Sequence, residues 1–267
     1  MSIKKTRLDL LLLEKGFAES RERAQALIAA GLVWVNGERC DKGGHAYLPT
    51  VDIKVDAPLR YVSRGGLKLE KAVSDFGILF AGKHVLDVGA STGGFTDCAL
   101  QNSASHVTAV DVGKGQIAWR LREDARVTVL EKTNIRYLDS AMLLNIPNMA
   151  TVDVSFISLR LVLPVLHRLL QGQGEVIALI KPQFEAGRVV ATRSRGVIKD
   201  PSVHREVLEN ILQFARELSW GLWGLTFSPL LGPEGNMEFL AWWKLGTADG
   251  QTIDVDFVIR EAHRALR

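Results

Sequence analysis

A glycine-rich turn joins an apolar run to a helix-forming run at residues 83–97, KHVLDVGASTGGFTD. The apolar run ends at Asp87, and Phe95 opens the segment that reads as a helix. Glycine lets the backbone approach a ligand closely, and the free N–H groups at a helix N-terminus face it. The stretch therefore predicts a nucleotide-type binding turn. The alternative is an ordinary strand-to-helix turn of an α/β enzyme.

The spacing of this turn separates two classes of cofactor. It is not G-x-G-x-x-G, so a dinucleotide fingerprint fits poorly. It is D-x-G-x-x-x-G-G-F-T, which resembles the S-adenosylmethionine loop of Rossmann-like methyltransferases. That resemblance implies which residues lie along the methionine end of the cofactor: Asp87, Gly89, Ser91, Gly93, Gly94 and Phe95.

Further apolar runs extend the predicted sheet. After the first strand at the turn, the expected parallel strands are 106–112, 126–130, 151–158 and 174–181, and an antiparallel hairpin follows at 222–228 and 237–245. The expected helices are 67–79, 116–123, 159–171, 203–218 and 254–267, and a long polar loop is expected at 183–202. The pattern predicts an α/β, Rossmann-like methyltransferase domain with a seven-stranded mixed sheet.

Two loops after these strands are candidates for the rest of the cofactor. Asp111 ends the second strand, where an acidic side chain can accept hydrogen bonds from a ribose diol. It could also cap the next helix, and both roles are compatible. Thr133 and Asn134 follow the third strand, at a place where a side chain or backbone group could read adenine.

Charged residues stand out on elements that converge at the carboxyl edge of the sheet. Asp153 lies in an apolar run, where a carboxylate is costly unless it is paired. Lys181 ends a buried strand, where ligands bind in open α/β sheets. Lys68 lies near a helix start, and Glu238 begins the last strand. The alternative to a catalytic set is a structural ion-pair network.

The N-terminal part reads as a small α+β domain. Helices are expected at 6–17 and after Ser20, then a strand at 32–35, a hairpin at Asn36-Gly37 and another strand at 46–55. Residues 1–65 hold 11 Lys and Arg against 8 Asp and Glu, so the net charge of +3 lies in this part. The excess hints at an anionic partner.

The run RLDLLLLEKGFAESRERAQALIAAGLVWVNG resembles the RNA-binding domain named after small-subunit ribosomal protein four. Arg and Lys suit phosphate contacts, and a serine at a helix N-terminus adds hydrogen-bond donors. The resemblance implies that these residues lie towards RNA phosphates: Arg7, Lys15, Ser20, Arg21 and Arg23. The alternative is a solvated helical face whose arginines alternate with glutamates.

The predicted domain boundaries are 1–58 for RNA binding, 59–66 for a linker and 67–267 for the methyltransferase. The linker carries Arg60 and Arg64, which could meet RNA or pack the domains together. The loop at 183–202 adds three further candidates for RNA contact, unless it is only a mobile, solvated loop. They are Arg188, Arg193 and Arg195.

The whole chain resembles the TlyA family, whose members are often labelled hemolysin. The strings that carry this resemblance are SRGGLKLEKA, LDVGASTGGFTD, VDVSFISL, IKPQFEAG, RGVIKD and GNMEFL. The four charged residues resemble the K-D-K-E tetrad of ribose 2′-O-methyltransferases of the RrmJ/FtsJ type. The resemblance implies methyl transfer from S-adenosylmethionine to cytidine in ribosomal RNA, 23S and in some members 16S, with S-adenosylhomocysteine as product.

The chemistry of such a tetrad is coherent. A ribose 2′-hydroxyl is a weak acid, so it needs a base and an environment that favours the alkoxide. A lysine can be that base only if its pKa falls, through desolvation or a second cation. We assign Lys181 as the general base and Lys68 as the group that stabilises the oxyanion. Asp153 and Glu238 orient the two ammonium groups, and no metal is needed.

Two rival functions remain at this stage, a membrane-acting hemolysin and a non-catalytic RNA-binding assembly factor. The sequence has no run of eighteen apolar residues, so no membrane-spanning helix is expected. Cys40 and Cys98 lie in different predicted domains, which favours free thiols and a cytoplasmic protein. The six histidines are scattered, so no metal is expected. Ribosomal RNA or a ribosomal subunit is the expected partner, and monomer or weak homodimer stays open.

Overall fold

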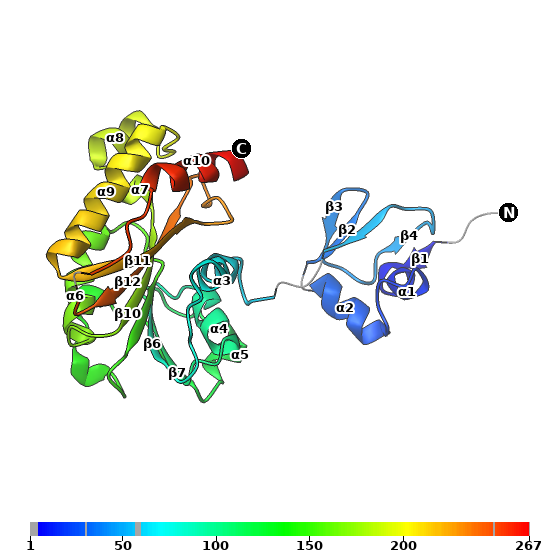
Figure 1. Cartoon of the computed structure of the whole chain (residues 1–267). Helices are drawn as coiled ribbons and strands as arrows, with labels where there is room; N and C mark the ends of the chain where they lie inside the picture. Colours follow the sequence, from blue (N-terminus) through cyan, green and yellow to red (C-terminus); the bar gives the residue numbers. More distant parts are fainter. Residues whose placement is uncertain (1–4, 30, 57–59, 248, 267) are drawn as a thin grey trace. The chain divides into compact units, whose positions relative to one another are not determined.

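A computed structural model describes residues 5–29, 31–56, 60–247 and 249–266 (Figure 1). The chain divides into two compact units, residues 1–60 and 61–267. Tyr61 to Gly66, which the sequence assigns to the linker, pack with the second unit. Tyr61 is buried in that unit's core, and Gly65 begins its first helix. Residues 57–59 of the expected boundary lie outside the described residues.

The first unit packs two helices against short strands. Its elements are β1 (Thr6–Arg7), α1 (Leu8–Glu14), α2 (Arg21–Ala29), β2 (Val33–Val35), β3 (Glu38–Cys40), β4 (Ala46–Tyr47) and β5 (Ile53–Val55). The predicted hairpin is confirmed, because β2 pairs with β3 and the intervening Asn36 and Gly37 both have positive φ. Leu8, Leu11 and Leu12 of α1 meet Leu27 and Ile28 of α2 in the core.

The single strand expected at 46–55 is wrong. The segment forms two short strands in different sheets, β4 beside β1 and β5 beside β2. Pro49 lies between them, and a proline has no N–H to donate to a continuous ladder.

The second unit is built on a seven-stranded mixed sheet, as expected. Its strands are β6 (His84–Val88), β7 (His106–Val110), β8 (Val127–Leu130), β9 (Met149–Val152), β10 (Glu175–Ile180), β11 (Trp220–Phe227) and β12 (Phe239–Leu245). Their order is β11-β12-β10-β9-β6-β7-β8. The predicted antiparallel pairing of β11 with β12 is confirmed, and β12 also pairs antiparallel with β10. The last strand is therefore inserted between two earlier ones.

Helices cover both faces of this sheet, because alternate side chains of each buried strand point to opposite faces. One face carries α3 (Gly65–Phe76), α4 (Gly94–Gln101) and α5 (Trp119–Arg122), and the other carries α6 (Leu163–Leu169), α9 (Pro201–Glu217) and α10 (Val255–Ala265) (Figure 1). Leu86 faces the second layer and Val85 the first. Three short 3-10 helices, η1 (Ile135–Tyr137), η2 (Ser140–Met142) and η3 (Leu159–Leu161), complete the connections.

Two expected segments differ from the structure. The polar loop at 183–202 contains α7 (Pro182–Glu185) and α8 (Arg188–Arg193). The strand expected to run to Ser158 ends at Val152. Phe156 has a φ of 63°, which an extended strand cannot contain, so the chain turns away from the sheet there.

Candidate functional site

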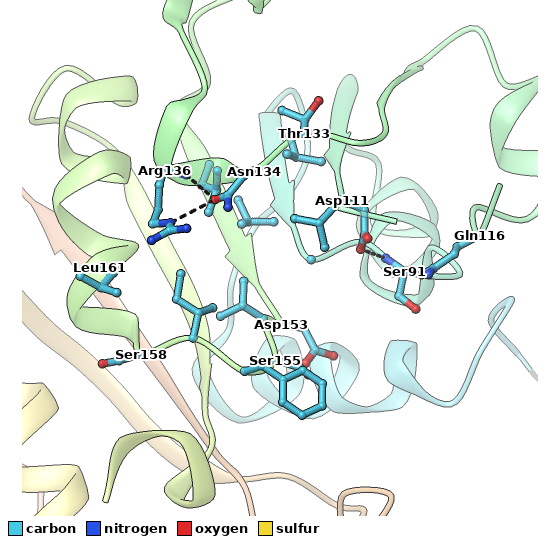
Figure 2. Close-up of a pocket in the computed structure, with 18 residues that line it drawn as sticks. Ser91, Asp111, Gln116, Thr133, Asn134, Arg136, Asp153, Ser155, Ser158 and Leu161 are labelled. Atoms are coloured by element: carbon cyan, nitrogen blue, oxygen red, sulfur yellow. Dashed lines mark hydrogen bonds between the residues drawn. The ribbon is translucent and has the colours of Figure 1, made fainter. Parts of the chain in front are cut away.

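A pocket of about 630 Å³ opens at the carboxyl ends of β6, β7, β8 and β9 (Figure 2). Here the strand order reverses, since β6 lies between β7 and β9, and ligands bind at such switch points. The lining comes from the loops that follow these strands. It consists of Val88, Gly89, Ser91, Val110, Asp111, Val112, Gln116, Thr133, Asn134, Ile135, Arg136, Asp153, Val154, Ser155, Phe156, Ile157, Ser158 and Leu161.

The glycine turn lies against the loop after β9. Gly89 has a φ of 81°, and a Cβ there would stand 2.6 Å from the carbonyl oxygen of Asp153. Only glycine fits that backbone at that distance. Gly93 and Gly94 do not line the pocket. A Cβ on either would clash, on Gly93 with Leu121 and on Gly94 with the N-terminus of α3.

Asp111 lines the pocket and also fixes the shape of the turn. Its carboxylate accepts hydrogen bonds from the backbone N–H of Ser91 at 2.8 Å and of Gly113 at 2.7 Å. Figure 2 shows the first of these bonds at one side of the pocket. A carboxylate held in this way can offer an oxygen to a ligand hydroxyl without moving.

Asp87 and Phe95 are placed differently from the sequence expectation, because neither lines the pocket. Asp87 is completely buried, and its carboxylate accepts hydrogen bonds from Thr96 at 2.6 Å and Thr151 at 2.8 Å. Burial raises the pKa of Asp87 to about 6, and the two hydroxyl donors oppose that rise. The residue ties β6 to β9 and α4, while Phe95 packs in the core.

Thr133 and Asn134 also line the pocket, after β8, and the backbone N–H of Thr133 donates to the carbonyl of Asp111 at 2.9 Å. The hydroxyl of Thr133 donates to the carbonyl of Glu131 at 3.0 Å. The side-chain oxygen of Asn134 accepts from the backbone N–H of Arg136 at 3.1 Å and so begins η1. In Figure 2 the Arg136 side chain lies beside Asn134.

The four charged residues form two ion pairs. Lys181 Nζ lies 2.6 Å from Asp153 and donates to Ser155 Oγ at 3.0 Å. Lys68 Nζ lies 2.6 Å from Glu238. Lys68, Lys181 and Glu238 are buried, and of the four only Asp153 lines the pocket. Buried pairs of this kind contribute little net stability, because desolvation offsets the attraction.

The sheet topology brings three of these residues to one edge. Asp153 directly follows β9 and Lys181 directly follows β10. Glu238 precedes β12, whose first residue Phe239 is in register with Ile180 at the end of β10. Because β12 runs antiparallel to β10, its beginning lies at the carboxyl edge of the parallel strands. Lys68 reaches this edge from α3.

Sequence reasoning missed the loop from Ser155 to Ser158 as part of the pocket. Phe156 is 90% exposed, and its ring centroid is 5.0 Å from that of Phe184 on α7. The carboxylate of Glu185 anchors the loop, since it accepts from Ser158 Oγ at 2.5 Å and from the backbone N–H of Leu159 at 2.8 Å. Burial raises the pKa of Glu185. The run VSFIS carries no glycine or proline that would have marked a turn.

The candidate RNA contacts are distributed over both units. In the first unit, Ser20 caps α2 by accepting from the backbone N–H of Arg23 at 3.2 Å, and Lys15 Nζ lies 3.5 Å from the carbonyl of Val51. Arg7 and Arg21 bind one buried carboxylate, that of Asp9. Arg60, the last residue of the first unit, is exposed, and so are Arg64 and Arg195 of the second unit. Arg188 and Arg193 lie on α8, and their side chains are outside what the structure describes.

Within the described ranges, no group of three His, Cys, Asp or Glu side chains is arranged to hold a metal ion. None of the helices described is both long and apolar enough to cross a bilayer. Within the described residues, neither Cys40 nor Cys98 forms a disulfide.

Comparison with known proteins gives the same two-part division. Residues 61–245 match the model of the FtsJ-like methyltransferase family, and residues 6–50 match the S4 domain. The chain is 48% identical to YqxC of Bacillus subtilis, covering 100% of this chain and 97% of that protein. It is 39% identical to the 16S/23S rRNA (cytidine-2′-O)-methyltransferase TlyA of Mycobacterium tuberculosis, covering 98% of each. A solved structure from Streptococcus thermophilus, labelled as a hemolysin, superposes with a TM-score of 0.76 at 43% identity, covering 99% of this chain and 98% of that one.

Proposed function

The chain belongs to the TlyA family of FtsJ-like methyltransferases, and on that premise we propose that it methylates the ribose 2′-hydroxyl of a cytidine in ribosomal RNA. It is an S-adenosylmethionine-dependent enzyme with an S4 domain. The observation that carries the proposal is the pair of buried lysine–carboxylate contacts at the sheet edge where the pocket opens. The 23S RNA is the first substrate to test, and 16S RNA the second.

The pocket residues fit the cofactor. A volume of about 630 Å³ is within the usual range for small-molecule sites, and Asp111 supplies an acceptor suited to a ribose diol. Thr133 and Asn134 would hold the adenine end, and the backbone from Gly89 to Ser91 the methionine end. Asp87 would act indirectly, by fixing the strand from which the turn departs. When bound, S-adenosylmethionine supplies an electrophilic methyl group.

The protein's own part in the reaction is to position the reacting groups and to accept a proton. With the cofactor bound, Lys181 as its neutral amine would accept the proton of the 2′-hydroxyl, and the cofactor would supply the methyl group that this oxygen receives. Asp153 and Ser155 hold the side-chain nitrogen of Lys181 in place. Lys68, held by Glu238, stabilises negative charge on the oxygen. In-line alignment supplies most of the remaining rate enhancement.

The substitution Lys181→Ala tests this assignment. We expect methyl transfer from tritiated cofactor to purified 23S RNA to fall by about 10³-fold or more, because proton transfer and alignment are lost together. Thermal unfolding would check that the variant folds. Lys83→Ala is the matched control, since Lys83 forms an ion pair with Glu175 at 3.0 Å at the opposite edge of the sheet. Activity that survives in Lys181→Ala would contradict the role of general base.

The two rival functions give different results in the same assays. A non-catalytic assembly factor would bind RNA without a saturable cofactor titration. A membrane-acting protein would release dye from vesicles of pure phospholipid, in the absence of RNA and cofactor.

A further inference from the structure

We propose that Asp9 is a positioning residue that holds Arg7 and Arg21 together as a clamp for one phosphate of the RNA backbone. The inference deepens the proposed function and rests on it. It concerns the S4 domain, where the arginines themselves were expected from the sequence and the carboxylate between them was not.

Asp9 accepts hydrogen bonds from three side chains, those of Arg7, Arg21 and Gln25. Its side chain is 0% exposed, in the first turn of α1. Arg7 donates to both of its oxygens, from Nε at 3.0 Å and from Nη2 at 2.9 Å. Arg21 Nε donates at 3.1 Å, and Gln25 Nε2 at 3.0 Å, to the same oxygen, Oδ2. Because both arginines bind one oxygen, their guanidinium groups are close neighbours.

The charges in this cluster do not cancel. Two guanidinium groups share one carboxylate, so a net positive charge remains. The side chains of Arg7 and Arg21 are 46% and 48% exposed, so that charge is accessible to solvent. Among the described contacts, Arg21 uses only Nε, which leaves its two terminal nitrogens available to a second acceptor. A guanidinium has five donors in a fixed fork, which suits binding a carboxylate on one edge and a phosphate on the other.

The location of the cluster also favours an anion. Arg21 is the first residue of α2, whose N-terminus is capped by Ser20. The unpaired N–H groups and the dipole of a helix N-terminus attract negative charge. Arg7 immediately precedes α1, and the adjacent backbone N–H of Leu8 is held by the carbonyl of His45 at 2.8 Å. Both arginines are therefore fixed at their backbones and at their side chains.

Two possible roles for Asp9 predict opposite changes in RNA affinity when its charge is removed. If Asp9 only neutralised positive charge, its removal would raise the net charge by one and strengthen RNA binding. If it orients the arginines, its removal would weaken binding, because two mutually repelling side chains would have to be ordered when RNA arrives. A purely structural contact between α1 and α2 would lower thermal stability and leave the affinity of the folded protein unchanged. Arg7 beside Asp9 holds the pKa of that carboxyl well below its usual range, so the carboxylate is charged at neutral pH.

The experiment compares full-length Asp9→Asn with Asp41→Asn, which makes the same charge change at an exposed position of the same unit. The probe is a 23S RNA transcript, titrated at constant salt. We expect the dissociation constant of Asp9→Asn to rise about tenfold, and that of Asp41→Asn to stay equal or fall. Cofactor affinity should be unchanged in both variants. In an Arg7→Gln/Arg21→Gln background, adding Asp9→Asn should cause no further loss.

The outcomes separate this inference from the function it rests on. Unchanged or tighter RNA binding by folded Asp9→Asn, while the wild type binds and methylates RNA, would overturn the role of Asp9 alone. A wild type that neither binds nor methylates ribosomal RNA would overturn the proposed function. If Asp9→Asn does not fold, Arg21→Lys tests the same geometry, because it keeps the charge and removes the fork. Wild-type affinity in Arg21→Lys would then reject the clamp.

Discussion

Asp87 and Asp9 are both buried carboxylates, and their surroundings shift their pKa values in opposite directions. Asp9 is held between two guanidinium groups, which lower its pKa. Asp87 accepts from the hydroxyl groups of Thr96 and Thr151 and from the backbone of Thr96, all of them uncharged donors, and burial raises its pKa to about 6. Burial alone does not decide the charge of an acid, because the partners decide whether the ionised form is compensated.

The raised pKa of Asp87 predicts how stability depends on pH. Between about pH 4 and 6 the folded state keeps a proton that the unfolded state has lost, so the wild type loses stability as pH rises through this range. The Asp87→Asn variant has no carboxyl group to titrate at this position, so it does not lose stability in this way. We therefore expect the free energy of unfolding of the variant, relative to the wild type, to increase by roughly 2–3 kcal/mol from pH 4 to 6 and then level off.

Urea unfolding of both proteins from pH 4 to 7 measures this difference. Asp52→Asn is the control, because Asp52 is exposed. A gap between Asp87→Asn and the wild type that does not change with pH would show that burial does not shift this group.

At the scale of elements, α7 supports the floor of the pocket from outside it. Glu185 accepts hydrogen bonds from Ser158 and from the backbone of Leu159, and Phe184 contacts Phe156. The loop between β9 and η3 therefore depends on a helix that follows β10. The positive φ of Phe156 shows that the loop adopts a conformation that local sequence disfavours and that its neighbours must stabilise.

Glu185→Gln tests this support. In Glu185 each oxygen accepts one of the two bonds, so a glutamine would place an NH2 group against one of the two donors, and the cost to the anchored loop is about 1–3 kcal/mol. We expect weaker binding of S-adenosylmethionine by calorimetry and unchanged affinity for 23S RNA. Glu206→Gln, at an exposed position of α9, is the matched control. Equal cofactor affinity in the two variants would mean that the loop holds its shape without α7.

The elements that could be predicted from the sequence are those whose pattern is local. Apolar runs that stop at a charge locate three strand ends to within a residue, since β6 ends one residue after Asp87 and β7 and β10 end directly before Asp111 and Lys181. The Asn36-Gly37 hairpin follows from its turn chemistry. The pairing of Lys68 with Glu238 could not be predicted from a local sequence pattern. It depends on β12 lying between β10 and β11, which is a long-range choice that no local pattern encodes.

Other differences have identifiable physical causes. Residues 153–158 are apolar enough to continue a strand, but Asp153 pairs with Lys181 and the chain turns at Phe156. α8 is only six residues long and contains the β-branched Val189, Val190 and Thr192, so no helical repeat of apolar residues marked it in the sequence.

The nine predicted cofactor residues divide into those that line the pocket and those that do not. Five of them line the pocket: Gly89, Ser91, Asp111, Thr133 and Asn134. Asp87 lies outside the lining and accepts hydrogen bonds from Thr96 and Thr151, and Gly93, Gly94 and Phe95 pack outside it.

At the scale of the whole molecule, each unit has its own core. Leu8, Leu11 and Ile28 belong to the core of the first, and the described apolar clusters of the second contain no residue from it. RNA affinity and methyl transfer should therefore be separable. Lys181→Ala should bind 23S RNA like the wild type, and Arg7→Gln/Arg21→Gln should bind S-adenosylmethionine like the wild type while its KM for RNA rises.

Filter binding with labelled RNA and calorimetry with the cofactor measure the two affinities. Loss of cofactor binding in the double arginine variant would reveal energetic coupling between the units, which independent cores do not predict.

β12 follows β11 in sequence but lies between β10 and β11 in the sheet, and this has a consequence for synthesis of the chain. Lys68 precedes its partner Glu238 by 170 residues in the chain. A growing polypeptide therefore carries its S4 domain and its glycine turn long before its set of paired charges is complete. On the proposed assignment of the tetrad, a polypeptide that ends before β12 would still carry the S4 domain but would lack Glu238, so we expect it to bind RNA without methylating it.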